Sequence, residues 1–150
     1  MALTKAYDAP TSSTVFESSA EVAKRSGRSI GDLTTKVQVK FSFHVNQKDP
    51  KSIVLYFYRT AREFSWSFNK EGYIGSNFGS LKLSTKLIHS KKTPTLFNVV
   101  QKQELVAAVI SLDEAKLLST SMDSECRVGD SEFIFPSKLA IDLRSMFAQI

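Results

Sequence analysis

Residues 37–45 alternate between apolar and polar side chains, and this pattern constrains the fold more than any other feature of the sequence. Side chains two positions apart lie on the same face of a strand, so strict alternation is typical of a strand with one buried face and one face in solvent. The stretch therefore predicts a half-buried β-strand. Its apolar members are Val37, Val39, Phe41, Phe43 and Val45.

The rest of the chain adds further short strand patterns separated by turns. Residues 52–58 predict a second strand, with Ile53, Leu55 and Phe57 on one face and Val54, Tyr56 and Tyr58 on the other. A short loop is expected over 59–62 before the next strand. The chain shows no alternation of strand with helix, so we predict a mainly β fold with peripheral helices, built as an antiparallel sheet or a two-sheet sandwich. The other expected strands are 64–68, 81–87, 95–100, 105–110, 125–128 and 131–135.

The first 35 residues differ from the rest in composition. They are rich in Ser, Thr and Ala and hold only scattered apolar side chains, so we expect a polar N-terminal arm over 1–35 and a single mainly β domain over 36–150. Within the arm, Thr14 and Glu17 have the spacing of a capping box, which predicts a short helix over 15–26.

Two more helices are expected beside the sheet. Ser111 is a favourable N-cap for a helix over 112–118, and the acidic residues of its first turn suit the positive end of the helix dipole. After Pro136, apolar residues recur at helical spacing and predict an amphipathic C-terminal helix that packs over a sheet face. These residues are Leu139, Leu143, Met146, Phe147 and Ile150.

Charge is distributed unevenly along a chain whose net charge is +5. Up to Lys102 there are 16 Lys and Arg against 7 Asp and Glu, whereas from Gln103 onward the counts are 4 and 8. Two interpretations stay open. In the first, the asymmetry serves a polyanionic partner or head-to-tail contact between copies. In the second, folding brings the two parts of one chain together, so that their charges neutralise each other.

No motif for catalysis is apparent, and we expect a protein that is not an enzyme and has no cofactor, no bound metal and no small-molecule substrate. The sequence lacks the G-x-x-x-x-G-K-[ST] loop for a triphosphate and the G-x-S-x-G turn of hydrolases. His44 and His89 are its two histidines, and each falls in a strand pattern that points it to solvent. Cys126 is the single cysteine, which excludes an intrachain disulfide and indicates a structural thiol on a strand.

The candidate binding residues are aromatic and basic. If Phe57 faces the core, Tyr56 and Tyr58 face outward, where their rings could stack on nucleobases. The alternative is that both tyrosines pack beneath the C-terminal helix. Basic residues lie in three places: in the arm, beside the tyrosines, and in a stretch before Gln103 that has no acidic residue. They could contact phosphates or an acidic surface of another copy. They are Lys24, Arg25, Arg28, Arg59, Arg62, Lys91 and Lys92.

These features favour a non-enzymatic interaction or assembly protein, such as a structural subunit of a virion or of another large complex. We expect a homo-oligomer, or a complex with other protein subunits, held through the arm and the oppositely charged ends of the chain. The alternative is a protein that binds single-stranded DNA or RNA with its basic residues between 24 and 102 and its sheet aromatics. We expect no membrane span and no signal peptide; these absences and the single cysteine favour the cytoplasm or a virion, although the sequence does not fix the location.

Overall fold

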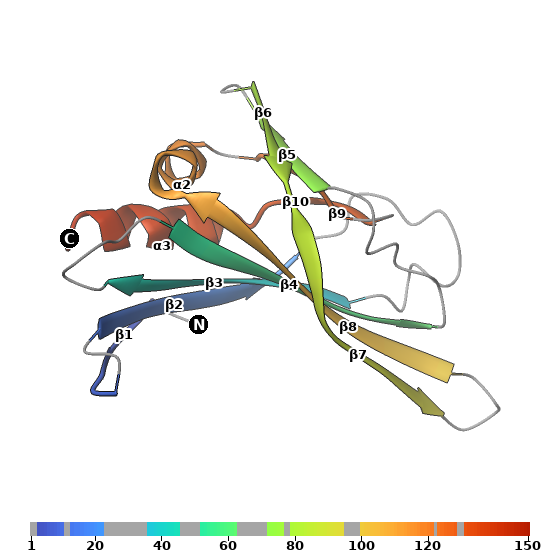
Figure 1. Cartoon of the computed structure of the whole chain (residues 1–150). Helices are drawn as coiled ribbons and strands as arrows, with labels where there is room; N and C mark the ends of the chain where they lie inside the picture. The colour runs from blue at the N-terminus through green and yellow to red at the C-terminus, as the bar shows by residue number, and fades with distance from the viewer. Residues whose placement is uncertain are drawn as a thin grey trace.

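The computed structural model describes residues 3–10, 13–22, 36–45, 52–62, 72–76, 79–94, 100–121, 123–128 and 131–150. Most of them lie in the strands of two antiparallel sheets, and two helices lie at the periphery (Figure 1). The predicted class, mainly β with an antiparallel two-sheet arrangement and peripheral helices, is therefore confirmed.

Six strands form the larger sheet, which we call sheet A, in the order β1-β2-β3-β4-β8-β7. Every neighbouring pair in it is antiparallel. Among the described strands, β1 and β7 are its two edges, and β7 and β8 extend beyond the other strands at one end (Figure 1). The bounds are β1 Thr4–Asp8, β2 Ser13–Glu21, β3 Lys36–Val45, β4 Ser52–Arg62, β7 Thr85–Pro94 and β8 Val100–Ser111.

Four shorter strands form sheet B, in the order β10-β9-β5-β6. Strand β6 is followed after one residue by β7, so one long ribbon connects the two sheets (Figure 1). Gly72 at the start of β5 is required by packing, because a Cβ there would lie 2.6 Å from the carbonyl oxygen of Arg127. The bounds are β5 Gly72–Ser76, β6 Gly79–Leu83, β9 Glu125–Val128 and β10 Ser131–Ile134.

Helices α2 (Leu112–Ser119) and α3 (Ser137–Phe147) lie on one side of sheet A (Figure 1). Helix α2 begins as predicted, because Ser111 Oγ accepts a hydrogen bond from the Glu114 N–H at 3.1 Å and the Glu114 carboxylate accepts one from the Ser111 N–H at 2.9 Å. The predicted C-terminal helix is also present. It buries Leu139, Ala140, Leu143 and Met146, whereas Phe147 is only half-buried.

The helix predicted over 15–26 is wrong for the described residues, because Ser13–Glu21 forms strand β2. The side chains of β2 alternate, with Phe16 buried and its neighbours less so, and β-branched and aromatic residues such as Val15 and Phe16 suit a strand. Glu17 does not cap a helix but forms an ion pair of 3.0 Å with Lys40 on β3. Residues 23–26 lie outside the described part of the chain.

Helix α3 is fixed to β2 by a polar cluster. The Ser18 hydroxyl donates a hydrogen bond to the Asp142 carboxylate, and Lys138 Nζ donates to Ser18 Oγ at 3.1 Å. Lys138 Nζ also lies 3.0 Å from Asp142 Oδ2, so the buried hydroxyl, the carboxylate and the ammonium group satisfy one another. The sheet and its helix layer therefore include a part of the N-terminal arm.

The loop predicted over 59–62 is also wrong, because these residues continue β4 and pair with β8 residues 101–104. The longer partner strand overrides the local turn preference of the sequence.

The strand expected over 64–68 lies outside the described residues, as do residues 95–99 of the strand expected over 95–100. The strands expected over 105–110 and 125–128 are confirmed, and the strand expected over 131–135 is present as Ser131–Ile134. The strand expected over 81–87 is divided between β6 and β7.

Candidate functional site

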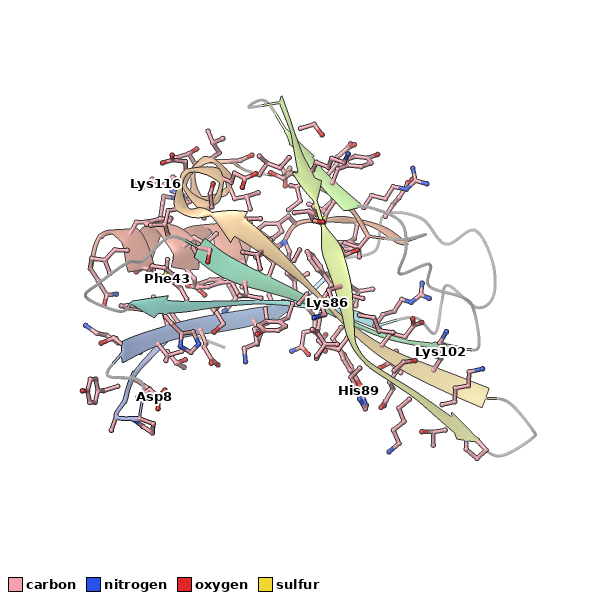
Figure 2. All side chains as sticks on the ribbon, in the orientation of Figure 1. Asp8, Phe43, Lys86, His89, Lys102 and Lys116 are labelled. Carbon is pink, nitrogen blue, oxygen red and sulfur yellow. The ribbon has the colours of Figure 1, made fainter. Side chains whose placement is uncertain are left out.

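The face of sheet A opposite the two helices is the leading candidate site, and we call it the open face because no described element covers it. Alternation along β4 buries Phe57 in the core and places Tyr56 and Tyr58, both half-buried, on the open face. The tyrosines therefore do not pack beneath α3. His44 and His89 are exposed on this same face, as the sequence predicts, and His89 projects from the side away from the helices (Figure 2).

The strand register arranges the open face in rows that cross four strands. Residues paired in an antiparallel sheet point to the same face, so the pairings of β3, β4, β8 and β7 define which side chains are neighbours. The tyrosines are flanked on one side by polar and basic residues of β3, and on the other by small or aliphatic residues of β8 and then by basic residues of β7. The first row is Lys40, Tyr56, Ala107 and Lys86; the second is Gln38, Tyr58, Leu105 and His89.

A hollow of about 410 Å³ lies on the open face, in the size range of small-ligand sites. Its lining combines the two tyrosine rings of β4 with hydroxyl, amide and charged groups of β2 and β3 and with Leu105 of β8. Such a surface can hold a flat ring and hydrogen-bond its edge. The lining includes Gln38, Lys40, Ser42, His44, Tyr56 and Tyr58.

Lys40 joins the charged and aromatic parts of this hollow. Its Nζ lies 3.0 Å from Glu17 Oε2 and 6.0 Å from the centroid of the Tyr56 ring. The side chains of Lys40 and Glu17 are 43% and 40% exposed, so solvent weakens their ion pair. An anionic ligand could therefore compete with Glu17 for the ammonium group at low cost.

Arg59, a predicted binding residue, is on the other side of the sheet. Arg59 is two residues from Phe57 on β4, so both side chains point to the core side of the sheet. Its side chain is buried, at 4% exposure, and its Nη2 lies 3.4 Å from Glu104 Oε1. Lys102 Nζ lies 3.7 Å from the same oxygen. Sequence analysis missed this buried ion pair, because Glu104 and Arg59 are far apart in sequence and only the β4–β8 register makes them opposite.

The other predicted basic residues are divided among several places. Lys91 and Lys92 are both exposed on β7, but their neighbours on β8 show that they point to opposite faces: Lys91 is opposite Gln103 on the open face, and Lys92 is opposite Lys102. Arg62 ends β4, and nothing is described of its side chain. Residues 24, 25 and 28 lie outside the described part of the chain.

The two edges of sheet A differ in charge. Strand β1 has one lysine and one aspartate in five residues, and its Tyr7 is 70% exposed. Strand β7 carries only basic ionisable residues, and all are exposed. These are Lys86, His89, Lys91 and Lys92.

Three acidic side chains of the second part of the chain are engaged within the molecule. Glu104 is buried beside Arg59, Glu114 caps α2, and Asp142 pairs with Lys138. The Arg59–Glu104 pair joins the basic and acidic parts of one chain, as the second interpretation of the charge asymmetry expects. Folding thus uses part of the negative charge that could attract a second copy.

Cys126 lies on β9 and is 2% exposed. Burial raises the pKa of its thiol, so the sulfur stays protonated and unreactive in the folded protein.

Within the described residues, no group of three His, Cys, Asp or Glu side chains could hold a metal ion. Neither described helix is long and apolar enough to cross a membrane.

Comparison of the chain with models of protein families, with curated proteins and with solved structures found no match. Function therefore has to be inferred from the geometry and the charge of these surfaces.

Proposed function

We propose that the protein is a non-enzymatic assembly protein, of the kind that forms a virion or another large complex, and that it associates with copies of itself through edge strand β1. No described strand pairs with the outer edge of Thr4–Asp8. An open strand edge presents N–H and C=O groups that can pair with a strand of another chain. Pairing of two β1 strands would join two copies of sheet A into one continuous sheet.

The sequence of β1 is complementary to itself in an antiparallel pair centred on Ala6. In that register Lys5 faces Tyr7 of the second copy, and Thr4 faces Asp8. A two-fold axis repeats each contact, so both lysines gain an aromatic neighbour and no like charges are opposite. This self-complementarity of an exposed edge is the observation that carries the proposal.

The opposite edge is unsuited to the same contact. Any antiparallel pair of β7 strands would bring basic side chains near basic side chains, since Thr85–Pro94 contains no acidic residue. A register irregularity between Leu87 and His89 further disturbs its outer edge. Lysines and bulges are devices by which edge strands avoid pairing.

Sedimentation velocity over a concentration series tests the proposal, with the full chain, a Tyr7→Lys variant and an Ile141→Lys control. In each dimer, Tyr7→Lys would place one lysine opposite each of the two Lys5 side chains. Ile141, in contrast, is 52% exposed on α3 and far from β1 in sequence. We expect the full chain and the control to dimerise as concentration rises, and Tyr7→Lys to stay monomeric. Because backbone pairing depends little on ionic strength, dimerisation should persist in high salt.

Two results would contradict the proposal. One is a full chain that stays monomeric at every concentration, and the other is a Tyr7→Lys variant that associates like the control. Association that disappears in high salt and is indifferent to Tyr7→Lys would favour contact through the oppositely charged ends of the chain instead.

A further inference from the structure

We infer that the open face of sheet A binds single-stranded nucleic acid, with bases stacked on Tyr56 and Tyr58 and phosphates held by the lysines on either side. This inference goes beyond self-association and uses a surface other than β1. The two functions can therefore be tested separately.

The spacing of the tyrosines suits successive bases of an extended strand. Tyr56 and Tyr58 are two residues apart on β4, which separates their side chains by about 7 Å along the strand. This is roughly twice the ~3.4 Å rise per nucleotide of a helical strand. Each ring can therefore receive one base that is not stacked on its neighbour, as in the recognition of single strands on sheet surfaces.

The open face has room for those bases. Next to Tyr56 on β8 is Ala107, which is too short to cover the ring, and next to Tyr58 is Leu105, which lines the hollow of about 410 Å³. Gln38 and Ser42 line the same hollow and could hydrogen-bond base edges.

Positive charge lies on both sides of the tyrosines. Lys40 is on the neighbouring strand β3, and Lys86 and Lys91 are on β7, two strand spacings or about 10 Å away. Strands β3, β4 and β7 contain no acidic residue, and Glu104, the acidic residue of β8, is buried on the other face. A polyanion lying over β3, β4 and β7 would meet positive charge, and at the border with β2 it would compete with Glu17 for Lys40.

These features favour a single strand over other polyanions. A duplex keeps its base faces stacked and so could not use the tyrosines. An anionic membrane could contact the exposed lysines of β7, but its flat surface would not bring rings into the hollow between β3 and β8.

Fluorescence anisotropy with a short labelled oligouridylate and the full chain tests the role of the rings. Alanine in place of one stacking residue should weaken binding by about 5- to 150-fold, so we expect this loss for Tyr56→Ala and for Tyr58→Ala. Tyr56→Phe keeps the ring and should bind like the unmodified chain. The melting temperature of each variant shows whether the fold is retained.

Two neighbouring lysines provide a matched test of the phosphate contacts. Lys91 is on the open face and Lys92 on the opposite face of the same strand, so Lys91→Gln and Lys92→Gln remove the same charge from different sides. For a single strand, each lost contact should reduce the slope of log K against log salt by about 0.7. We expect this reduction for Lys91→Gln and an unchanged slope for Lys92→Gln.

The inference is overturned if the oligonucleotide does not bind, if folded Tyr56→Ala and Tyr58→Ala variants bind as tightly as the unmodified chain, or if Lys92→Gln reduces the slope as much as Lys91→Gln. Vesicles of phosphatidylserine and phosphatidylcholine serve as the second ligand. Binding to these vesicles that requires Lys86 and Lys91 but not the tyrosines, without binding of the oligonucleotide, would assign the surface to a membrane. The Tyr7→Lys variant should still bind the oligonucleotide, and this result would separate nucleic-acid binding from self-association.

Discussion

Phe16 of β2 lies directly opposite Phe43 of β3, and both side chains are buried in the hydrophobic core. In Figure 2, Phe43 lies between β3 and helix α3. The pair ties a segment of polar composition to the core of sheet A. It also means that β2 stabilises the sheet on which both proposed surfaces depend.

Replacement of Phe16 should therefore be costly. Truncation of a buried aromatic side chain lowers the free energy of unfolding by about 3–5 kcal/mol, and we expect this loss for Phe16→Ala. Val15 is the matched control, since it is the preceding residue, faces the other side of the sheet and is half-buried. Urea denaturation should show a clearly smaller loss for Val15→Ala, and equal losses would contradict the placement of β2 in the core.

Helix α3 should depend more on Leu143 than on Phe147. Leu143 is fully buried, whereas Phe147 is half-buried at the end of the helix. Leu143→Ala should lower the free energy of unfolding by about 2–5 kcal/mol, and Phe147→Ala by less despite its larger side chain. A larger loss for Phe147→Ala in the same urea titration would contradict the half-burial of this side chain.

Cys126 should make stability fall at alkaline pH. Burial raises the pKa of its thiol in the folded protein, whereas a cysteine in the unfolded chain has a pKa of about 8.5. Below that pH both states keep the proton; above it only the unfolded state loses it, so stability decreases by up to ~1.4 kcal/mol per pH unit. The stability of Cys126→Ala, measured by urea denaturation across this range, should decline less steeply than that of the unmodified chain. Parallel declines would contradict the burial of the thiol.

Much of the fold could be predicted from local patterns. The period-two alternation of β3 reflects one buried face of a strand. The N-cap Ser111 of α2 reflects contacts made within a few residues. Strand β2 could not be predicted in this way, because Thr14 and Glu17 match a capping box by spacing alone. Its pairing with β3 is a long-range contact that overrides this local preference.

The candidate site was predictable only in part. Alternation about Phe57 is enough to place Tyr56 and Tyr58 on the face away from the core. It also assigns Arg59 to the core side, but the buried partner Glu104 depends on the register of β4 with β8. Lys91 and Lys92 are adjacent on one strand, so their opposite orientations could be predicted from the sequence. Their nearness to the tyrosines could not, because it depends on the strand order β4-β8-β7.

The central claim, self-association through β1, is tested most directly by a reversal of charge across the proposed register. In that register Lys5 faces position 7 of the second copy, so Tyr7→Lys alone should abolish dimerisation by placing like charges opposite each other. Lys5→Glu combined with Tyr7→Lys should restore it, because each glutamate would then face a lysine. Sedimentation velocity should show a monomer for the single variant and a dimer for the double variant. A double variant that remains monomeric, or a single variant that still dimerises, would contradict the account.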